Sequence, residues 1–515
     1  MAMLWWQLPL LTLFFLWVRI FPIWPRRNRG CDAYYFLLSA ETFRRERRLP
    51  IVFDPHPYLL EPAEQWYPPL FPILMGLLSP RWLRRYYWSL NHLIDLVALW
   101  ALFFLVYSQF GLIPAILAAI IYTFSPNLIS EFSALTSRSL GLLVFLPFMG
   151  ALFHWHQSPD PLSLLLVTLA GVVLLYTHKL TVQLMVFMMV FLALGWRLGA
   201  GVDWVWLAPL PAIYLAALLV GRGYFIDILR AHWDIVTFWN RNWRLFGAHA
   251  IHGSPLYPKG HKQAQIHSPV FGQNMLKRLL LQGKAVFLLN PAVLLVLLNL
   301  AAFRPFYDIQ VFMLFWTAGT YLWATATIQV PFLRCLGEGT KYIKYAEFPV
   351  IFLASPMVMG GDMPDWHLWI IAVWLCLHLA YYLFTVYRQR SGEIVTGVES
   401  PELQVLLKII EALPHPRVVC LPTALSDLTA YVTRKEVLWG THGYGFKRVG
   451  NFYPVLRHPL GHLVNQHALT HLLLDRTYVD PQEIGLEDRN PLASSGRYLL
   501  YSLDPPPGPG LLATP

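Results

Sequence analysis

The stretch "LWWQLPLLTLFFLWVRIFPIW" (residues 4–24) is followed at residues 30–50 by "GCDAYYFLLSAETFRRERRLP". The first stretch is apolar over about 20 residues, the length that an α-helix needs to cross a bilayer. It has no basic start, it carries Trp5 and Trp6, and no small-residue cleavage site precedes Pro25, so we expect a retained membrane helix. The second stretch places Asp32 just before an apolar-periodic run, which predicts a helix that begins at the membrane surface.

The composition extends this interpretation to the whole chain. Of 515 residues, 56% are hydrophobic and 13% are charged, which is about half the charged share of a soluble domain. The net charge is +10, and because the charges lie between apolar segments we expect lipid phosphate, and no nucleic acid, as their partner. The four cysteines form neither a CxxC motif nor a Cys/His cluster, so neither a zinc site nor a disulfide scaffold is predicted.

Apolar segments that are typical of membrane helices recur along the first 390 residues. They lie near 4–24, 86–107, 111–125, 137–155, 161–177, 179–197, 204–221, 284–302, 307–330, 346–360 and 366–387. Segments 111–125 and 346–360 are short, so we expect broken or tilted helices there. The fold class that follows is a polytopic α-helical membrane protein with about 11 transmembrane helices.

The polar sequence falls on one side of the membrane if all these segments cross it. The loops at 25–85, 126–136, 222–283 and 331–345 and the tail from 388 then share one face. An enzyme that works at one membrane surface requires such an asymmetry. We expect a membrane domain at 1–390, with its large loops at 25–85 and 222–283, and a separate domain at 391–515.

The C-terminal segment has the composition of a soluble domain. "RVVCLP", "EVLWG", "THLLLD" and "GRYLLYSL" predict short strands, and "TALSDLTAYV" and "GHLVNQHAL" predict helices between them. This alternation indicates a small α/β unit without a dinucleotide or nucleophile motif. The last residues, "DPPPGPGLLATP", predict a disordered tail.

Five motifs in this order resemble the GT-C membrane glycosyltransferases, which include protein O-mannosyltransferases, aminoarabinose transferases and the catalytic subunits of oligosaccharyltransferases. The motifs are "CDAYYFLLSAETF" (31–43), "EQWYPPLFPILMGLLS" (64–79), "SEFSALTSRSLGLLVF" (130–145), "YTHKLT" (176–181) and "LRCLGEGTKYIKYAEFP" (333–349). The resemblance covers roughly residues 1–390 by order of elements.

The resemblance implies a sugar donor on a polyprenyl phosphate in the bilayer and an acceptor whose hydroxyl attacks the anomeric carbon. Whether the acceptor is a glycan, a lipid or a protein stays open. The sequence departs from the family in one respect, because it contains no D-x-D or D-x-E pair. We therefore expect a reaction without a divalent metal and without another cofactor.

Asp32 is the candidate general base, and its position in the family's first loop is the main reason. A carboxylate that is partly desolvated near a membrane also gains basicity. The alternative is an N-cap, since Asp32 directly precedes a helical pattern, and the two roles are compatible. Tyr35 on the same predicted helix is a further candidate site residue.

Glu131 and Arg138 are seven residues apart, so two helical turns bring them to one face. Arg138 stands just inside an apolar run, where an arginine is costly unless it meets an anion. We predict that it binds the donor phosphate while Glu131 orients hydroxyls. The alternative is a structural ion pair between two helix ends.

His178 and Lys179 lie between two apolar segments that are joined almost without a loop. Lys179 is a candidate for phosphate binding, and the alternative is that it extends toward lipid head groups. His178 is a candidate site residue, although capping a helix end explains it as well.

The segment 333–349 joins two glycines to several charges. Arg334 and Lys341 are candidates for phosphate binding, Lys344 adds charge, and Glu338 and Tyr342 are further site candidates. Glycines at 337 and 339 permit a tight turn and close approach to an anion. The alternative is an ordinary basic loop at the membrane surface.

Three more features need a prediction. Asp95, with Asn91 and His92, lies on one face of an apolar helix, as a site residue or in a hydrogen-bond set that fixes helix packing. The segment 222–283 predicts an interfacial helix at 225–246 and an acceptor-side or lid loop. Its histidines, at 249, 252, 261 and 267, have no metal-site spacing.

Two other functions fit parts of the sequence. A transporter or flippase of a lipid-linked substrate shares the many spans, although the candidate residues lie at one rim rather than at the midplane. A scaffold without catalysis does not need Asp32. Sidedness is contested: the arginine-rich loops favour the cytoplasm, whereas the family resemblance implies the extracytoplasmic face of a plasma (inner) membrane, which we expect.

Overall fold

The computed structural model describes most of the chain. The described residues are 2–24, 27, 30, 32–197, 201–242, 290, 292–301, 308–337, 339–356, 366–391, 400–440, 445–450, 452–453 and 458–503. Outside the described residues lie the histidines at 249, 252, 261 and 267, Glu338 and the tail from 504.

The chain forms two compact units, each built from segments that are distant in sequence. Unit 1 contains Met1–Arg27, Arg84–Ile226 and Asn274–Gly392, and unit 2 contains Asn28–Leu83, Asp227–Gln273 and Glu393–Pro515. The first long loop and the C-terminal segment therefore belong to the same unit.

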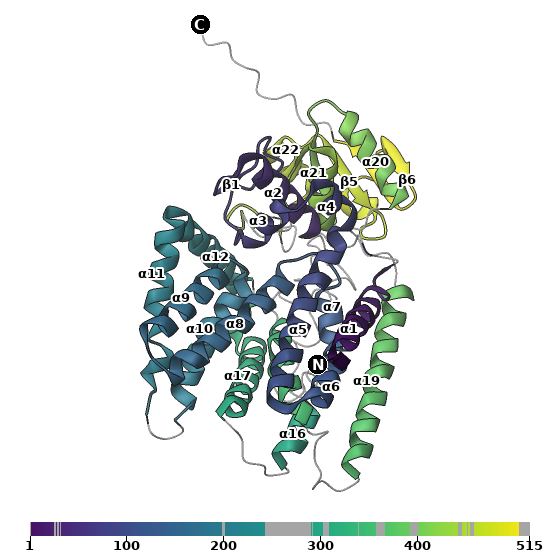
Figure 1. The fold of residues 1–515 in the computed structure, drawn as a ribbon. Helices are drawn as coiled ribbons and strands as arrows, with labels where there is room; N and C mark the ends of the chain where they lie inside the picture. Colours follow the sequence, from purple (N-terminus) through teal and green to yellow (C-terminus); the bar gives the residue numbers. More distant parts are fainter. Residues whose placement is uncertain are drawn as a thin grey trace. The chain divides into compact units, whose positions relative to one another are not determined.

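Unit 1 is a helical bundle (Figure 1). Its helices are α1 (Ala2–Ile20), α5 (Leu90–Phe110), α6 (Leu112–Thr123), α7 (Pro126–Glu131), α8 (Arg138–Gln157), α9 (Pro161–Leu175), α10 (Lys179–Gly195), α11 (Pro209–Gly221), α16 (Val293–Ala301), α17 (Asp308–Gln329), α18 (Lys344–Ala354) and α19 (Trp366–Ser391). Each predicted span overlaps one of these helices, although residues 284–289 and 357–360 of two spans lie outside the described residues. The short α7 lies between two of the spans. The 3-10 turns η3 (Trp204–Trp206), η5 (Pro331–Leu336) and η6 (Gly339–Tyr342) join them.

Among the residues that the structure describes, four helical segments of unit 1 and its border are long and apolar enough to cross a membrane. They are Pro80–Phe110, Arg138–Gln157, Trp204–Gly221 and Asp308–Gln329. The shorter apolar helices are Trp6–Ile20, Leu112–Thr123, Pro161–Leu175 and Lys179–Gly195. The expected short helices are short, because α6 has 12 residues and α18 has 11. The fold is that of a helix-rich membrane protein, and the count of about 11 crossings stays a prediction.

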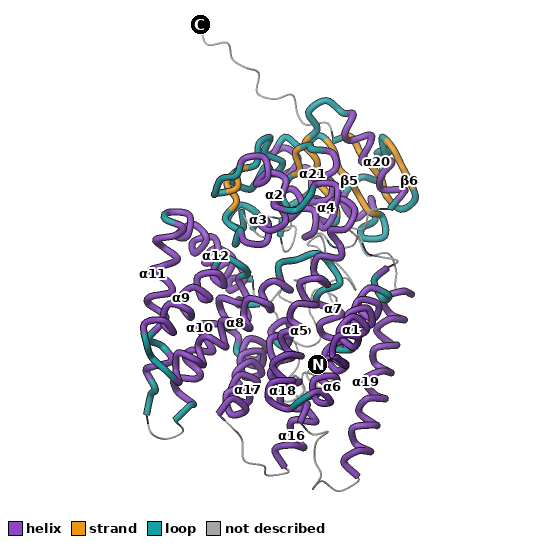
Figure 2. The backbone as a smooth tube through the Cα atoms, viewed as in Figure 1, coloured by secondary structure: helices purple, strands orange, loops and turns teal. Residues whose placement is uncertain are grey.

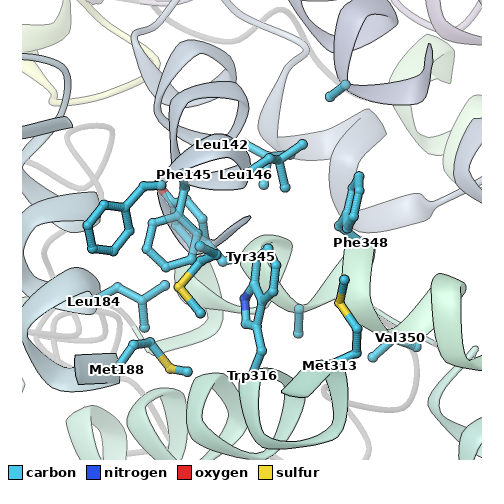
Figure 3. Close-up of a cluster of buried hydrophobic side chains, with 14 of the residues drawn as sticks. Leu142, Phe145, Leu146, Leu184, Met188, Met313, Trp316, Tyr345, Phe348 and Val350 are labelled. Carbon is cyan, nitrogen blue, oxygen red and sulfur yellow. The ribbon is translucent and has the colours of Figure 1, made fainter. Parts of the chain in front are cut away.

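The core of unit 1 forms where α8, α17 and α18 meet. Figure 3 shows aromatic and aliphatic side chains of these helices in one cluster. The Tyr345 ring lies 5.2 Å from that of Phe145, and the Trp316 ring lies 6.1 Å from that of Phe348. Such edge-on and offset pairs add about 0.5–1.5 kcal/mol each beyond the burial of their area. This packing fixes the N-terminal end of α18, where Lys344 begins the helix.

Unit 2 combines the first loop with the C-terminal segment. Its first part contains α2 (Asp32–Glu46), β1 (Ile51–Val52), β2 (Glu64–Gln65) and α3 (Leu70–Leu77), and α4 (Pro80–Tyr86) leads to α5. Its last part contains α20 (Pro401–Ala412), β3 (Arg417–Leu421), α21 (Ser426–Thr433), β4 (Glu436–Val437), α22 (Leu460–His467), β5 (His471–Asp475), β6 (Ala493–Ser495) and β7 (Tyr498–Ser502). The strands and helices predicted from the C-terminal sequence are confirmed; α20 and β6 are additional.

The sheet of unit 2 has the order β4-β3-β5-β7-β6. Its strands are orange in Figure 2. Strands β3, β4 and β5 run parallel, and β7 is antiparallel to both β5 and β6. The first loop extends this sheet, because Leu59 N donates to Val437 O at 2.9 Å and Val437 N donates to Pro57 O at 2.8 Å. Backbone pairing of this kind joins the two distant parts of unit 2.

Helix α2 is more deeply buried than a surface helix. Residues 33–40 are all buried, because α3 covers one side of the helix and α21 another. A Cβ at Gly76 would lie 2.8 Å from Phe43 Cδ1 and 3.0 Å from Ala40 O, so only glycine lets α3 approach this closely. The expected surface helix is therefore wrong for the middle of α2, and Asp32 at its first position is half-buried.

Candidate functional site

A charged cluster lies between α7, α8 and α18 in unit 1. Glu131 Oε2 accepts a hydrogen bond from Lys344 Nζ at 2.9 Å and contacts Arg138 Nη1 at 3.4 Å. The side chain of Lys344 is fully buried, whereas that of Arg138 is 24% exposed. The structure therefore brings together two predicted site residues, Glu131 and Arg138, and adds Lys344 as their partner. Arg138 is the member of the cluster with the greatest exposure.

Local structure explains why these side chains meet. Ser125 caps the N-terminus of α7, where Leu128 N donates to its hydroxyl at 3.4 Å, and Pro126 at the first turn needs no partner for its nitrogen. Helix α7 then ends at Glu131 after 6 residues. Asn91 on α5 fixes the next segment, because its Nδ2 donates to Ala134 O at 2.6 Å and its Oδ1 accepts from Ser139 Oγ at 3.0 Å.

A glycine on α8 lets α10 and α18 approach the same point. A Cβ at Gly141 would lie 3.3 Å from His178 Cβ, from Thr181 Cγ2 and from Tyr345 Oη. His178 is buried and precedes α10, and Lys179 is the first residue of that helix. The start of α10 is therefore packed next to the start of α8, one turn beyond Arg138, so the structure brings His178 into the neighbourhood of the cluster.

The electrostatics of the cluster favour an anion. Burial opposes the charge of Glu131, but the ammonium of Lys344 and the guanidinium of Arg138 outweigh burial and lower the pKa of Glu131 to about 2. Burial lowers the pKa of Lys344 to about 8, and the carboxylate of Glu131 opposes this effect. Lys341 also acts on both groups. Among the described residues, Glu131 is thus the carboxylate on which three cations act, and cations gathered in this way suit a phosphate.

The turn that carries Lys341 is held by unit 1 itself. Gly337 has a φ of +125°, a conformation that side chains other than glycine rarely adopt. A Cβ at Gly339 would lie 2.1 Å from Ala324 O, so its close approach is to α17. Tyr342 is fully buried, and its hydroxyl bonds to Leu336 O at 2.9 Å and to the amide oxygen of Gln183. These contacts fix the turn.

Arg334 and Glu338 are the remaining charged candidates of this segment. Arg334 lies in η5 (Pro331–Leu336), where its backbone alone is described. Glu338 lies outside the described residues.

Asp95 belongs to an ion pair inside the bundle. Its carboxylate contacts Arg19 Nη2 at 3.2 Å and accepts from Tyr122 Oη at 2.6 Å, and both side chains of the ion pair are fully buried. Arg19 also donates to Tyr122 O at 2.9 Å and to Ser125 O at 3.3 Å. The set joins α1, α5 and the end of α6. This arrangement corresponds to the packing alternative for Asp95.

Asp32 and Tyr35 lie on α2 in unit 2. Asp32 is the first residue of the helix and half-buried. Tyr35 is 1% exposed, its hydroxyl donates to Gln65 Oε1 at 3.1 Å, and its ring contacts those of Phe53 and Tyr67. Tyr35 therefore serves the core of unit 2, whereas Asp32 is at the edge of that core.

One member of the charged cluster, Lys344, was not chosen as a binding residue from the sequence. The sequence placed Lys344 among the charges of its loop without choosing it as a binding residue. The sequence did contain a signal that Lys344 is buried. Lys344 directly precedes the apolar run "YAEFPVIFLA", and a lysine at the first turn of such a helix is predicted to be buried. Within the described residues, no group of three or more His, Cys, Asp or Glu side chains is arranged to hold a metal ion.

Comparisons with known proteins give a fold and no sequence relative. No family model matches the chain, and no curated protein sequence does either. The oligosaccharyltransferase of Archaeoglobus fulgidus, tethered to an acceptor peptide with the NVT sequon, matches with a TM-score of 0.56 and 13% identity, over 91% of this chain and 68% of that one.

Two further structures show similarity. The archaeal oligosaccharyltransferase AglB from Archaeoglobus fulgidus, in complex with an inhibitory peptide and a dolichol-phosphate, matches with a TM-score of 0.54 and 13% identity, over 91% of this chain and 69% of that one. ArnT from Cupriavidus metallidurans in the apo state aligns over 98% of both chains at 12% identity, with a TM-score of 0.42, too low for an argument. Over nine-tenths of its length, the chain thus shares the fold of the archaeal oligosaccharyltransferase, one of the kinds of enzyme that its motifs resemble.

Proposed function

We propose that the protein is an integral-membrane glycosyltransferase. It transfers a sugar from a polyprenyl-phosphate donor to an acceptor hydroxyl, and Asp32 is the general base. The observation that carries the proposal is the cationic cluster of Arg138, Lys344 and Lys341 around Glu131, in a bundle with the fold of AglB. One of the AglB structures contains a dolichol-phosphate, and a lipid phosphate is the kind of anion that such a cluster suits.

The reaction assigns one role to each charge. The carboxylate of Asp32 takes the proton of the acceptor hydroxyl as its oxygen attacks the anomeric carbon. The bond between that carbon and the phosphate oxygen breaks, and polyprenyl phosphate leaves with the bonding electrons. Arg138 binds the phosphate and stabilises the negative charge that develops on it, which is the largest contribution in many such reactions. Glu131 keeps the cations in position.

The geometry of the cluster favours this function over a transporter. The buried Lys344 and the partly exposed Arg138 lie at the beginnings of α18 and α8, which the predicted eleven crossings would put at one membrane surface. A transporter has its substrate site near the midplane, on interrupted helices. The fold of AglB points in the same direction as this placement.

The test is a transfer assay in proteoliposomes with a labelled polyprenyl-phosphate sugar and a membrane extract as acceptor pool. The proposal expects release of unlabelled polyprenyl phosphate and label in a new product, both lost in Arg138→Gln. Movement of intact donor across the bilayer without any transfer would instead establish the transporter.

Metal dependence is a prediction in its own right. Because the sequence has no paired acidic residues and hard cations need several oxygen ligands, we expect EDTA to leave turnover within a factor of about two. The measurement is the initial transfer rate before and after chelation, with and without added Mn²⁺ or Mg²⁺. A rate that EDTA abolishes and Mn²⁺ restores would make Glu131 or Glu338 a metal ligand.

Sidedness is best tested at an exposed position of α20. Glu411 on this helix is exposed, so a cysteine there can react with a labelling reagent. A buried position of the same unit, such as Ser426 at 2% exposure, could not. With the native cysteines replaced, we expect Glu411→Cys to react with an impermeant maleimide on intact cells. The matched control is Ser158→Cys, in a short connection of the opposite face, which should react only after the cells are broken. Reversed labelling would place the cluster in the cytoplasm.

A further inference from the structure

Helix α12 (Gly223–Arg241) has one buried and one exposed face. The buried face carries Phe225, Ile228, Ala231, Ile235, Phe238 and Trp239. In unit 2 it packs against the C-terminal segment, with the rings of Phe238 and Phe446 4.5 Å apart. Asp234 contacts Lys447 Nζ at 3.0 Å and strengthens this attachment. The helix is therefore held on one side by protein.

The exposed face of α12 is apolar at its centre. Trp233 is 70% exposed, Ile226 is 40% exposed and Leu229 is 37% exposed. With 3.6 residues per turn, positions 226, 229 and 233 fall within a narrow stripe on one side of the helix. A tryptophan and two large aliphatic side chains exposed along one stripe are unusual for a surface that only water contacts.

Basic residues flank this apolar stripe. Arg230 and Arg241 lie on the same exposed face, and the exposed Arg222 directly precedes the helix. The two acidic residues of the helix are half-buried, and each is paired: Asp227 with Arg230 at 3.1 Å, and Asp234 with Lys447. The exposed face thus carries an excess of positive charge around apolar side chains. A surface of this kind binds in the plane of a membrane interface, with its arginines at phosphates.

We propose that the exposed face of α12 docks on an anionic lipid surface. Trp233, Leu229 and Ile226 insert between the acyl chains and the head groups, where tryptophan is enriched. Arg222, Arg230 and Arg241 bind lipid phosphates. The interaction fixes α12 at the membrane and, through its buried face, the part of the C-terminal segment that packs on it. This binding does not depend on the proposed transfer reaction.

The test uses the full-length protein in nanodiscs, with its native cysteines replaced and a donor dye on Asn240→Cys, which lies on the exposed face. Energy transfer is measured to tail-labelled phosphatidylglycerol and to tail-labelled phosphatidylcholine. We expect more transfer to phosphatidylglycerol, because each arginine near the surface favours an anionic lipid by about fivefold. The triple substitution Arg222→Gln, Arg230→Gln and Arg241→Gln should remove this preference.

A matched control tests whether the lipid preference depends on arginines of the exposed face of α12 or only on the total charge of the protein. Replacing the exposed Arg448, Arg476 and Arg489 by glutamine removes the same charge from other parts of unit 2 and should leave the preference intact. Trp233→Ser with Leu229→Ser should lower transfer to both lipids. Equal transfer to both lipids in the parent protein, or the same loss in both triple variants, would overturn the proposal.

Discussion

Replacing Asp32 by asparagine is expected to lower turnover by about 10²–10⁴-fold, the usual effect of removing a general base. Asparagine keeps the shape of the side chain and remains a good N-cap, so the start of α2 should not loosen. Donor affinity should be nearly unchanged, since the phosphate is assigned to Arg138 and its neighbours. The measurement is the initial transfer rate at saturating donor, with thermal unfolding as a check on the fold.

Two further variants separate catalysis from capping. Asp32→Ala removes both the base and the cap, so it should lose activity and about 1 kcal/mol of stability. Asp54→Asn is the matched control, because Asp54 is an exposed acid of the same loop and its substitution should not affect the rate. Turnover of Asp32→Asn within a factor of about three of wild type, together with a destabilised Asp32→Ala, would leave Asp32 as a helix cap alone.

The sequence predicted the helical bundle well because the signal is local. A membrane helix needs a long apolar run, and each run has a helix in its described part, including the short α6 and α18. The α/β segment was also predictable, since "THLLLD" and "GRYLLYSL" have the composition of buried strands and pair as β5 and β7. These features depend on neighbours within about 20 residues.

Long-range pairing was outside the reach of the sequence. Nothing in "DPHPYLLEP" indicates that residues 57–60 join the edge of β4, or that Tyr58 Oη donates to Asp427 Oδ1 at 2.8 Å. Loop and C-terminal segment were therefore expected in different domains. Similarly, the apolar pattern of α2 predicted one buried face, but Gly76 and the packing of α3 and α21 bury residues 33–40 all round. A single sequence shows the apolar residues but not the partner that covers them.

The candidate site was predictable in part for the same reason. Glu131 and Arg138 are close in sequence, so helical geometry alone relates them. Lys344 is 213 residues from Glu131, and only the packing of α18 against α8 brings it near. Asp95 had two interpretations that the sequence left open. Its ion pair with Arg19 depends on how α1 crosses α5, a contact that no local pattern indicates.

Breaking the buried pair of Glu131 and Lys344 should have the largest effect on stability. Glu131→Gln leaves the ammonium of Lys344 buried without its carboxylate, and Lys344→Met removes the shorter of the two contacts of Glu131. Each single substitution is expected to cost about 3–5 kcal/mol, because an uncompensated charge stays in the interior. The double variant removes both charges and should regain most of this loss. Thermal and denaturant unfolding in detergent measure the cycle.

The loss of stability at low pH depends on the same pair of Glu131 and Lys344. The pKa of Glu131 is lowered to about 2, whereas an unfolded glutamate has a pKa of about 4.3. Its contribution to stability is therefore fully present above about pH 4.3 and is lost as the pH falls toward 2. This acid-induced loss should be smaller in Glu131→Gln, and Glu64→Gln, at an exposed acid of unit 2, should leave it unchanged.

The stable double variant then isolates the role of Lys344 in donor binding. Without the lysine, a charge-assisted hydrogen bond to phosphate of about 1.5–3 kcal/mol is missing, so donor affinity should fall by about 10–100-fold while the fold persists. The wild type should lose affinity as the pH rises through about 8, where the buried Lys344 releases its proton. In Lys344→Arg this alkaline loss should disappear, because arginine stays charged. Donor affinity equal to wild type in the double variant would show that the pair only supports the helices, and that Arg138 and Lys341 hold the phosphate without it.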